Sequence, residues 1–296
     1  APGQWNGLDF KGTTAASLCD YCVIEYGGAD ANNANVRIAH STPTIRNSTI
    51  QHSSGRGITT TSSAPILENN TIANNASYGL YLGGNTDATK PILTGNTFTA
   101  NSLTPTPGFW NGISLFAPTP SSLLDHCVVE YGGAGTTNAN LQISSSTPTI
   151  QNSTIRFSDG NGLTATNSSP ILKNNAFANN GTYGVRLGLG PATARPILQG
   201  NTFSNNGSYP LHLEVRNFPT PFSGNSYTNN TQQAIELVGG FFDTNLTFPH
   251  EGIPYVVTTT ITVSGNPSPT LTVAPGVALR FNANTGLMVG IGAPPP

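Results

Sequence analysis

The amino-acid sequence predicts an all-β protein, a single-stranded parallel β-helix whose coils contain about 22–33 residues. Two observations support this prediction: a long internal repeat and a shorter repeat within it. The long repeat has a period of 105 residues, because TPTIRNSTI at 42–50 returns as TPTIQNSTI at 147–155. In the same way, GQWNGLDF at 3–10 returns as GFWNGISL at 108–115. A fixed internal period is the signature of a solenoid.

The shorter repeat is a column of apolar residues that begin strand-like segments such as GLDF, GLYL and GVRL. In the first long repeat the steps between its members are 28, 22, 22 and 33 residues, so one long repeat contains four short ones. Such a unit is too short for a strand, a helix and a second strand. It fits one turn of a β-helix, whose strands stack at about 4.8 Å. The members of the column are Leu8, Val36, Ile58, Leu80, Ile113, Leu141, Leu163, Val185, Leu211 and Ile235.

Two further apolar columns predict a second and a third strand in most coils. Side chains in a strand alternate between its two faces. In GLYL we therefore expect Leu80 and Leu82 to face inward and Tyr81 to face outward. The second column contains Ile45, Leu67, Leu93, Leu124, Ile150, Leu172, Leu198 and Phe222. The third contains Ile50, Ile72, Phe98, Val129, Ile155, Phe177, Phe203 and Tyr227.

Asparagine also recurs in columns, which predicts ladders of side-chain hydrogen bonds along the stack. Asparagine further tolerates the left-handed backbone of a tight turn. One column follows the second apolar column by three residues and contains Asn70, Asn96, Asn175, Asn201 and Asn225. The others contain Asn75 with Asn101, and Asn180 with Asn206 and Asn230.

We expect the whole chain, 1–296, to form one elongated β-helix domain. The internal duplication spans 3–107 and 108–212, and 213–296 is expected to hold further coils and a C-terminal coil or linker. About thirteen coils would make a rod of roughly 60 Å. Charged residues make up only 8% of the chain and the net charge is −2, so we expect no nucleic-acid partner. No apolar run approaches the length of a membrane span, and none is expected.

Several of these units resemble those of right-handed parallel β-helix proteins of the pectate-lyase-like superfamily. More narrowly, the chain is similar to the β-helix repeats of large bacterial surface proteins. The resemblance rests on the patterns GxWxGIxF, YCxIEYGG and SxPxIxNxxI, and on TLTVAPGVALRFNANTGLMVG at 270–290. That last stretch is similar to the coil that usually precedes a GxWxG unit. The resemblance covers essentially the whole chain and implies a right-handed fold, but one fold hosts many activities.

The three cysteines, Cys19, Cys22 and Cys127, are expected to pack as small buried hydrophobes. Cys22 and Cys127 are repeat equivalents, and Cys19 falls where the second repeat has Leu124. A metal site at CDYC would need further thiols or histidines, which do not accompany it. Three is an odd number, so no disulfide framework is implied. We expect no cofactor and no metal.

One group of charged residues on the outward face could support chemistry: Arg186, His212, Glu214 and Glu236. They fall on three successive coils, so neighbouring rungs could bring them into contact. One interpretation is a small acid–base or sugar-binding site. The preferred interpretation is that these side chains solvate a face of the rod and pair across strands. No residue is therefore predicted to be catalytic.

Two acids and two tryptophans recur in both long repeats. A catalytic group is needed only once, so recurrence favours a structural role. Glu25 and Glu130 are expected to stabilise turns by hydrogen bonds. Trp5 and Trp110 are expected to pack within the rungs, although an exposed aromatic ring could stack on a sugar.

The two ends of the predicted rod lack the polar caps with which monomeric solenoids cover their terminal coils. The first strand follows Trp5 almost at once, and the far end finishes with the apolar segment GLMVGIG. The sequence therefore predicts a non-enzymatic structural protein, extracellular or at the cell surface. The uncapped ends have two explanations: the chain is a segment of a longer repeat protein, or its copies stack head to tail into a filament or stalk, which is the preferred interpretation. The alternatives are an adhesin or carbohydrate-binding module, with a polysaccharide as partner, and a polysaccharide lyase or hydrolase.

Overall fold

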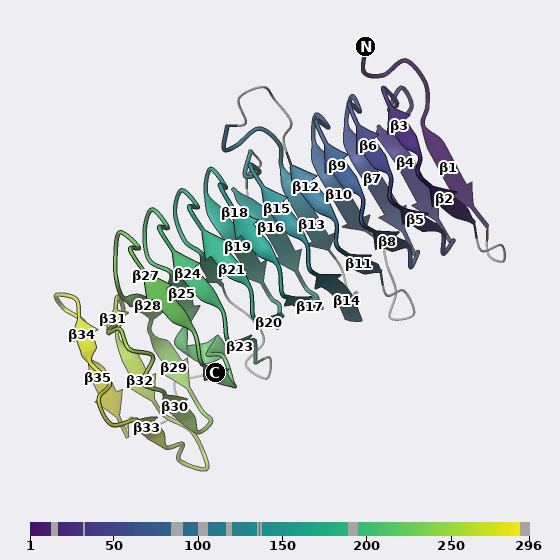
Figure 1. Ribbon diagram of the computed structural model, residues 1–296. Coiled ribbons are helices and arrows are strands. Elements are labelled where there is room, and N and C mark those ends of the chain that lie inside the picture. The colour runs from purple at the N-terminus through teal and green to yellow at the C-terminus, as the bar shows by residue number, and fades with distance from the viewer. Residues whose placement is uncertain are drawn as a thin grey trace.

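The computed structural model describes residues 1–12, 17–31, 33–83, 91–99, 106–116, 120–134, 136, 138–188 and 195–290. The chain forms a right-handed parallel β-helix, in which short strands stack on their equivalents in the next coil (Figure 1). The described residues contain no α-helix, and the one short helix is the 3-10 turn η1 (Val215–Asn217). The predicted fold class is confirmed.

The longest sheet takes one strand from each coil and forms one continuous face of the rod (Figure 1). Within the described ranges it has twelve strands, against the thirteen or so coils predicted. At about 4.8 Å per strand these span roughly 53 Å. In order they are β1 (Leu8–Lys11), β4 (Ala34–Ala39), β7 (Arg56–Thr61), β10 (Tyr78–Gly83), β13 (Gly112–Phe116), β16 (Ala139–Ser144), β19 (Asn161–Thr166), β22 (Val185–Leu187), β25 (Leu211–Glu214), β28 (Ile235–Val238), β31 (Tyr255–Val257) and β34 (Leu279–Phe281).

Two nine-stranded sheets form the other faces of the regular coils. The second sheet contains β2 (Leu18–Asp20), β5 (Thr44–Arg46), β8 (Ile66–Glu68), β11 (Ile92–Thr94), β14 (Pro120–Asp125), β17 (Thr147–Gln151), β20 (Ile171–Lys173), β23 (Ile197–Gln199) and β26 (Phe222–Ser223). The third contains β3 (Val23–Glu25), β6 (Thr49–Gln51), β9 (Thr71–Ala73), β12 (Thr97–Thr99), β15 (Val128–Glu130), β18 (Thr154–Arg156), β21 (Ala176–Ala178), β24 (Thr202–Ser204) and β27 (Ser226–Thr228).

The order in which strands join the sheets changes after β26 and β27. For this reason the regular spacing between apolar columns is lost over 231–260, although strands continue through that range. An aromatic cluster packs there, with the ring of Phe218 centred 5.2 Å from Phe248 and Phe248 5.7 Å from Tyr255. Two small sheets replace the nine-stranded ones: β29 (Gly240–Phe242) with β32 (Ile261–Val263) and β35 (Leu287–Val289), and β30 (Leu246–Phe248) with β33 (Leu271–Val273).

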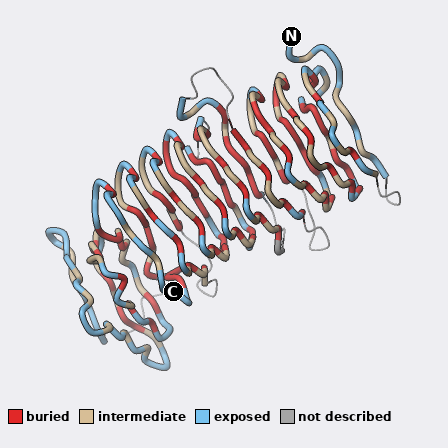
Figure 2. The backbone as a smooth tube through the Cα atoms, in the orientation of Figure 1, coloured by how far each residue is buried: buried red, intermediate tan, exposed pale blue. Residues whose placement is uncertain are grey.

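The strand register confirms the three apolar columns. In the first sheet Leu80 pairs with Ile58 on one side and with Ile113 on the other. The second and third columns pair in the same way in the other two sheets. Leu80 and Leu82 are fully buried while Tyr81 between them faces outward, as predicted. Figure 2 shows the buried residues following the inside of each regular coil, whereas the last coil is largely exposed.

The main asparagine ladder is confirmed. Asn70 donates from Nδ2 to Oδ1 of Asn96 at 3.0 Å. Asn175 donates to Asn201 at 3.0 Å, and Asn201 to Asn225 at 3.1 Å. The same oxygens also accept backbone N–H groups of the preceding coil, so each buried amide satisfies groups in two coils.

The ladder position is shared by other small polar residues. Ser48 and Ser153 occupy it in the coils before Asn70 and Asn175, and their hydroxyls accept the backbone N–H groups of Cys22 and Cys127. Each long repeat therefore carries the order Cys, Ser, Asn, Asn along the stack. At the far end Asn225 donates to Oε2 of Glu251 at 3.0 Å, so a carboxylate terminates the ladder.

The second ladder follows the same pattern. Asn180 donates to Asn206 at 3.0 Å and Asn206 to Asn230 at 2.8 Å, after which Gln233 accepts from Asn230. Asn75 accepts from Asn35. Its expected partner Asn101 lies outside the described residues. Among the asparagines near the ladders, those that precede ladder positions adopt the left-handed turn conformation, such as Asn69, Asn174 and Asn205.

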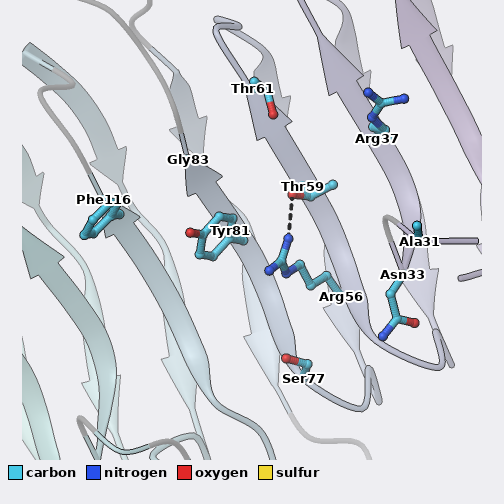
Figure 3. Close-up of a pocket in the computed structure, with 10 residues that line it drawn as sticks. All are labelled: Ala31, Asn33, Arg37, Arg56, Thr59, Thr61, Ser77, Tyr81, Gly83 and Phe116. Atoms are coloured by element: carbon cyan, nitrogen blue, oxygen red, sulfur yellow. Dashed lines mark hydrogen bonds between the residues drawn. The ribbon is translucent and has the colours of Figure 1, made fainter.

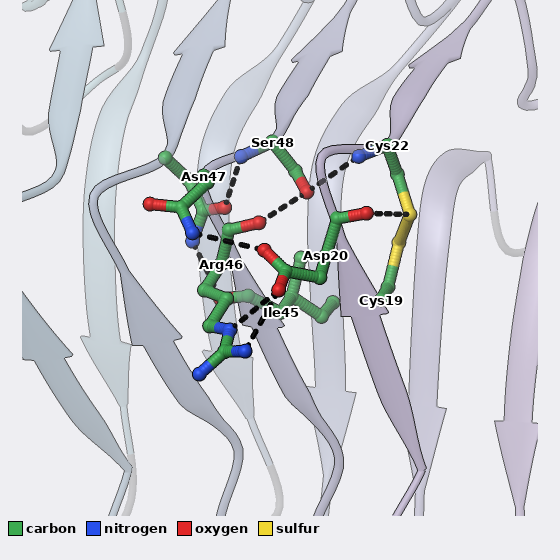
Figure 4. The surroundings of a disulfide bond; sticks show 8 residues. Cys19, Asp20, Cys22, Ile45, Arg46, Asn47 and Ser48 are labelled. Carbon is green, nitrogen blue, oxygen red and sulfur yellow. Dashed lines mark hydrogen bonds and ion pairs between the residues drawn. A yellow bond between two sulfur atoms is a disulfide. The ribbon is translucent and has the colours of Figure 1, made fainter.

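Cys19 and Cys22 form a disulfide (Figure 4), which corrects the expectation of three unpaired cysteines. Tyr21 lies between β2 and β3 with a φ of 54°, and this left-handed turn leaves the two Cα atoms 6.0 Å apart. That separation is within the range that a disulfide can bridge. Cys127 is free and buried, as predicted, beside Leu124.

Candidate functional surfaces

The two tryptophans provide an internal comparison between the first coil and its equivalent in the middle of the rod. Trp5 donates its indole N–H to the carbonyl of Glu25 at 2.8 Å, and Trp110 donates to the carbonyl of Glu130 at 2.9 Å. The two side chains therefore hold the same place in their coils. Trp110 is 3% exposed, whereas Trp5 is 42% exposed. The prediction that both pack within rungs is right for Trp110 only.

A glycine in the preceding coil makes room for the buried ring. A Cβ atom added to Gly79 would lie 2.8 Å from Cζ3 of Trp110, so the ring packs directly against this backbone. Gly79 precedes Leu80, which pairs with Ile113 in the next strand of the first sheet. The tryptophan position is therefore built to be covered by another β-helix coil.

Both terminal coils expose apolar side chains, as the sequence predicted. At the N-terminal end Leu18 and Val23 are exposed on the outward side of β2 and β3, while the inward Leu8 and Phe10 of β1 are half-buried. At the C-terminal end the exposed residues come from β33, β34 and β35. They are Val273, Phe281, Leu287, Met288 and Val289.

The outward face of the first sheet contains a hollow of about 590 Å³ across β4, β7, β10 and β13 (Figure 3). A second hollow of about 390 Å³ continues it to β19, and the two share Tyr81 and Phe116. The first is lined by Ala31, Asn33, Arg37, Arg56, Thr59, Thr61, Ser77, Tyr81, Gly83 and Phe116. We refer to the two hollows together as the outer groove.

Tyr81 and Arg56 form the centre of the outer groove. The guanidinium carbon of Arg56 lies 4.1 Å from the centroid of the Tyr81 ring, and Nη1 of Arg56 donates to the hydroxyl of Thr59 at 3.3 Å. A Cβ atom at Gly83 would lie 2.5 Å from Cε1 of Tyr81. The absence of a side chain at Gly83 therefore allows the ring to lie along its own strand. Phe116 is exposed on the neighbouring strand.

The charges in the outer groove are unevenly compensated. Arg37 forms an ion pair with Asp9 at 3.0 Å, so its charge is matched. Arg56 contacts the Tyr81 ring and the Thr59 hydroxyl, and no carboxylate belongs to the described lining of either hollow. The groove therefore presents one guanidinium charge that a ligand could neutralise.

The charged group predicted on the same face is partly brought together. Nδ1 of His212 in β25 lies 2.7 Å from Oε2 of Glu236 in β28, and these strands are neighbours. The ring of Tyr183 meets His212 edge to face with centroids 5.3 Å apart. Tyr183 is the member that sequence reasoning missed, because it lies in the turn before β22 and outside the outward columns. Its signal in the sequence is that a tyrosine recurs at 78, one long repeat earlier, and at 209, in the next coil.

Electrostatics within this group favour an ionised Glu236 and a neutral Tyr183. Burial opposes ionisation of Glu236, but hydrogen bonds from His212 and Tyr183 hold its pKa below the ordinary value. Burial, together with the hydrogen bond to Glu236, raises the pKa of Tyr183 to about 12. Such a carboxylate can orient an imidazole for proton transfer. The side chains of His212 and Glu236 are only 10% and 15% exposed, however, and neither lines the outer groove.

The other two predicted members lie beside this pair. Arg186 is opposite His212 in the neighbouring strand β22, and its charge lowers the pKa of Glu236 further. Glu214 lies at the end of β25, opposite Val238. The preferred interpretation, that these side chains pair across strands, describes the contact between His212 and Glu236.

The recurring acids also pair between coils, and not within turns as expected. Glu130 accepts from Nε of Arg156 at 2.8 Å, and Glu25 accepts from Nε2 of Gln51 at 2.9 Å. The partner lies in the next strand of the third sheet in each case. Both acids therefore support stacking of the third sheet.

The described residues contain no group of three or more His, Cys, Asp or Glu side chains placed to hold a metal ion. They also contain no helix long and apolar enough to cross a membrane.

Comparison with known proteins shows the family of the fold. The family model for a right-handed beta helix region matches residues 5–142 and 121–267. No curated protein sequence matches the chain. Among solved structures, the A-module of mannuronan C-5 epimerase AlgE4 from Azotobacter vinelandii is similar in fold, with 13% identity and a TM-score of 0.45. The match covers 87% of this chain and spans 63% of that module.

Proposed function

The chain belongs to the right-handed β-helix family, and from this premise we propose that it is a non-enzymatic structural protein. Its copies stack end to end outside the cell, so that the last coil of one copy covers the first coil of the next. A contact of this head-to-tail kind does not close on itself and therefore produces a filament or stalk.

The observation that supports this proposal most directly is the difference between Trp5 and Trp110. The two residues hold equivalent places and make equivalent hydrogen bonds, yet only Trp110 is covered. The cover over Trp110 is a parallel β-helix coil from the same chain. The chemistry that fits over Trp5 is therefore another coil of the same type, supplied by a second copy or by preceding chain, and we propose the second copy.

The C-terminal coil is the segment of a second copy that matches this requirement. Leu279 belongs to the same column as Leu80, because the register of the first sheet continues through Ile235 and Tyr255 to Leu279. Stacking would place Leu279 next to Leu8 at about 4.8 Å and extend the first sheet by β-augmentation. The half-buried inward residues Leu8 and Phe10 of β1 would be covered by Leu279 and the exposed Phe281 of β34.

Two features support a role outside the cell without catalysis. The Cys19–Cys22 disulfide is of a kind that persists in oxidising compartments. The closest pair of an acid and a histidine, Glu236 with His212, is largely withdrawn from solvent and lies outside the outer groove.

The stacking proposal is tested by placing a charge on the face of the last coil that the next copy would cover. Phe281 in β34 continues an inward column of the first sheet, because it pairs with the buried Val257, yet its side chain is exposed. Phe281→Lys therefore opposes burial of that face in the stack. Thr202→Lys, at an outward position of β24 far from either end, is the matched control. Sedimentation velocity and electron microscopy should show filaments for the unmodified chain and for Thr202→Lys, and single rods for Phe281→Lys. Single rods with both ends free for the unmodified chain would refute the proposal.

A second variant tests which coil covers Trp5. Ala278 precedes Leu279 as Gly79 precedes Leu80, so its methyl group would press on the Trp5 ring in the stack. Ala278→Gly should therefore strengthen association. No change in association constant would show that the C-terminal coil is not the segment that covers Trp5.

A further inference from the structure

Five asparagines of the chain are followed directly by glycine. In such a pair the backbone nitrogen of the glycine can attack the side-chain amide of the asparagine, because glycine has no side chain to hinder the approach. The structure decides which of the five pairs is free to react. They are Asn6–Gly7, Asn111–Gly112, Asn161–Gly162, Asn180–Gly181 and Asn206–Gly207.

The fold requires the glycine of the first two pairs. Gly7 has a φ of 98° and Gly112 a φ of 93°, a region that favours glycine. A Cβ atom at either position would also clash with a backbone carbonyl oxygen of the next coil, that of Ala34 or Ala139. The reactive pair at 6–7 is therefore a consequence of packing β1 against β4.

Asn111 is held by the coil before it. Its backbone N–H donates to the carbonyl of Ser77 at 3.1 Å, and its Nδ2 group donates to the Ser77 hydroxyl at 3.4 Å. Gly112 is buried in β13, where it pairs with Tyr78 of β10. Attack on the Asn111 amide therefore requires this coil to open first.

In three further pairs the glycine N–H that would have to attack already donates to a carbonyl of another coil. The donors are Gly162, Gly181 and Gly207, and the acceptors are the carbonyls of Tyr183, Ser158 and Asn180, at 2.9, 2.9 and 2.8 Å. The asparagine side chains of these pairs are buried as well. All three amides are therefore protected in the folded chain.

Asn6 is the equivalent of Asn111 one long repeat earlier, but no coil of the described chain lies before it. Its side chain is exposed, and β1 begins only at Leu8, so Gly7 lies outside the strand. The contacts that Ser77 makes with Asn111 have no counterpart at Asn6 among the described residues. Of the five amides, that of Asn6 is the one open to attack.

We propose that Asn6 is a modification site, where the amide converts spontaneously to a carboxylate at a free N-terminal face and so prevents the next copy from stacking there. The nitrogen of Gly7 bonds to Cγ of Asn6 while the bond from Cγ to Nδ2 breaks. Nδ2 leaves as ammonia and takes the proton that the Gly7 nitrogen carried. Water, the only other reactant, then opens the succinimide ring and leaves an aspartate or an isoaspartate at position 6.

The effect on stacking rests on the proposed end-to-end assembly. Position 6 lies beside Trp5, on the face that the last coil of another copy would cover. The new carboxylate is ionised at neutral pH, and burying an unpaired charge under a coil is unfavourable. A copy that stacks in time protects Asn6 as the preceding coil protects Asn111. The reaction therefore ages free ends and spares the interior of a filament.

The site itself is tested on single rods, which Phe281→Lys supplies. Peptide mapping by mass spectrometry follows all five pairs in one sample held in mildly alkaline buffer, so the other four asparagines are internal controls. Position 6 should convert at least about tenfold faster than position 111, because only the latter needs a coil to open. Asn6→Gln should remove most of the ammonia released, since its longer side chain must close a larger ring. Equal rates at 6 and 111, or no conversion at 6, would overturn the site.

The effect on stacking is tested with Asn6→Asp, which carries the charge of the product from the start. It should remain as single rods in electron microscopy. Asn229→Asp makes the same change at an exposed turn away from both end faces, and it should form filaments. Filaments from Asn6→Asp like those of the unmodified chain would overturn the block. Single rods for the unmodified chain would refute end-to-end assembly alone, because the preference for position 6 is measured without it.

Discussion

The change Asn201→Ala removes one amide from the middle of the main asparagine ladder. Oδ1 of Asn201 accepts the backbone N–H and the Nδ2 group of Asn175, both at 3.0 Å. Its Nδ2 donates to the carbonyl of Leu172 at 2.9 Å and to Oδ1 of Asn225 at 3.1 Å. The side chain is completely buried, so water cannot replace the lost partners without entering the core.

The loss expected from Asn201→Ala follows from these four bonds. An orphaned buried donor, here the backbone N–H of Asn175, costs about 1–3 kcal/mol, and each remaining bond contributes about 0.5–1 kcal/mol. The total destabilisation is about 2.5–6 kcal/mol. Because coils of a solenoid interact mainly with their neighbours, we expect the loss to appear first in the coils on either side of Asn201.

Hydrogen exchange and urea denaturation together measure this loss. Backbone amides of β20, β23 and β26 should lose protection in Asn201→Ala, while those of β6 should keep it. Ser204→Ala is the control from the same coil, in a half-buried outward position, and should change stability by less than about 0.5 kcal/mol. If Asn201→Ala were no more destabilising than Ser204→Ala, the ladder would not contribute to stability and the reasoning would be refuted.

Three further predictions concern single side chains. Burial raises the pKa of the Cys127 thiol to about 11. A maleimide at neutral pH should therefore label no cysteine in the folded chain, and one cysteine after unfolding without reductant. Labelling in the folded state would contradict the burial of Cys127. Burial also raises the pKa of Glu251, although the hydrogen bond from Asn225 lowers it. The protonated Glu251 side chain therefore contributes its full stability below about pH 4.3, and this contribution is lost as pH rises through the raised pKa of the folded state. Glu251→Gln should flatten that part of the stability curve, and an unchanged slope would assign it to another group. Trp110→Ala should cost about 3–5 kcal/mol in urea denaturation of single rods and Trp5→Ala less than about half of that; equal losses would contradict the difference in burial.

The fold could be predicted almost completely because a solenoid converts equivalence in sequence into adjacency in space. Leu8, Leu80 and Ile235 are spaced irregularly along the chain, yet they belong to one column of the first sheet. Loops of different length between coils do not disturb this register. The prediction became weaker only after β27, where β29 and β30 belong to new sheets and the second and third columns end, although the first sheet continues to β34.

Contacts that depend on the backbone of a turn could not be predicted in the same way. The Cys19–Cys22 disulfide needs the left-handed turn at Tyr21, which the apolar pattern does not encode. Tyr183 approaches Glu236 from such a connection, so the outward columns contained His212 and Glu236 but not the tyrosine. The outward face of these charged residues could be predicted from the sequence, but their contact partners could not.

The outer groove was missed for a related reason. Arg56 stands at the start of β7, two positions before the first column, and its guanidinium reaches forward to Tyr81 in the next strand. The ring can lie there only because Gly83 has no side chain. A pattern of alternating inward and outward residues does not describe a long side chain that crosses between coils.

The internal duplication supplies what the pattern lacks. Both long repeats form the same coils, so a residue that differs between them is not required by the backbone that it occupies. By this criterion Thr59 and Gly83, which recur, belong to the scaffold, whereas the coil does not require Arg56 or Tyr81. The same comparison makes Trp5 informative, since it holds the same place and the same hydrogen bond as Trp110 but is not covered by a coil of the described chain. Equivalent positions therefore separate what the coil needs from what is particular to one coil.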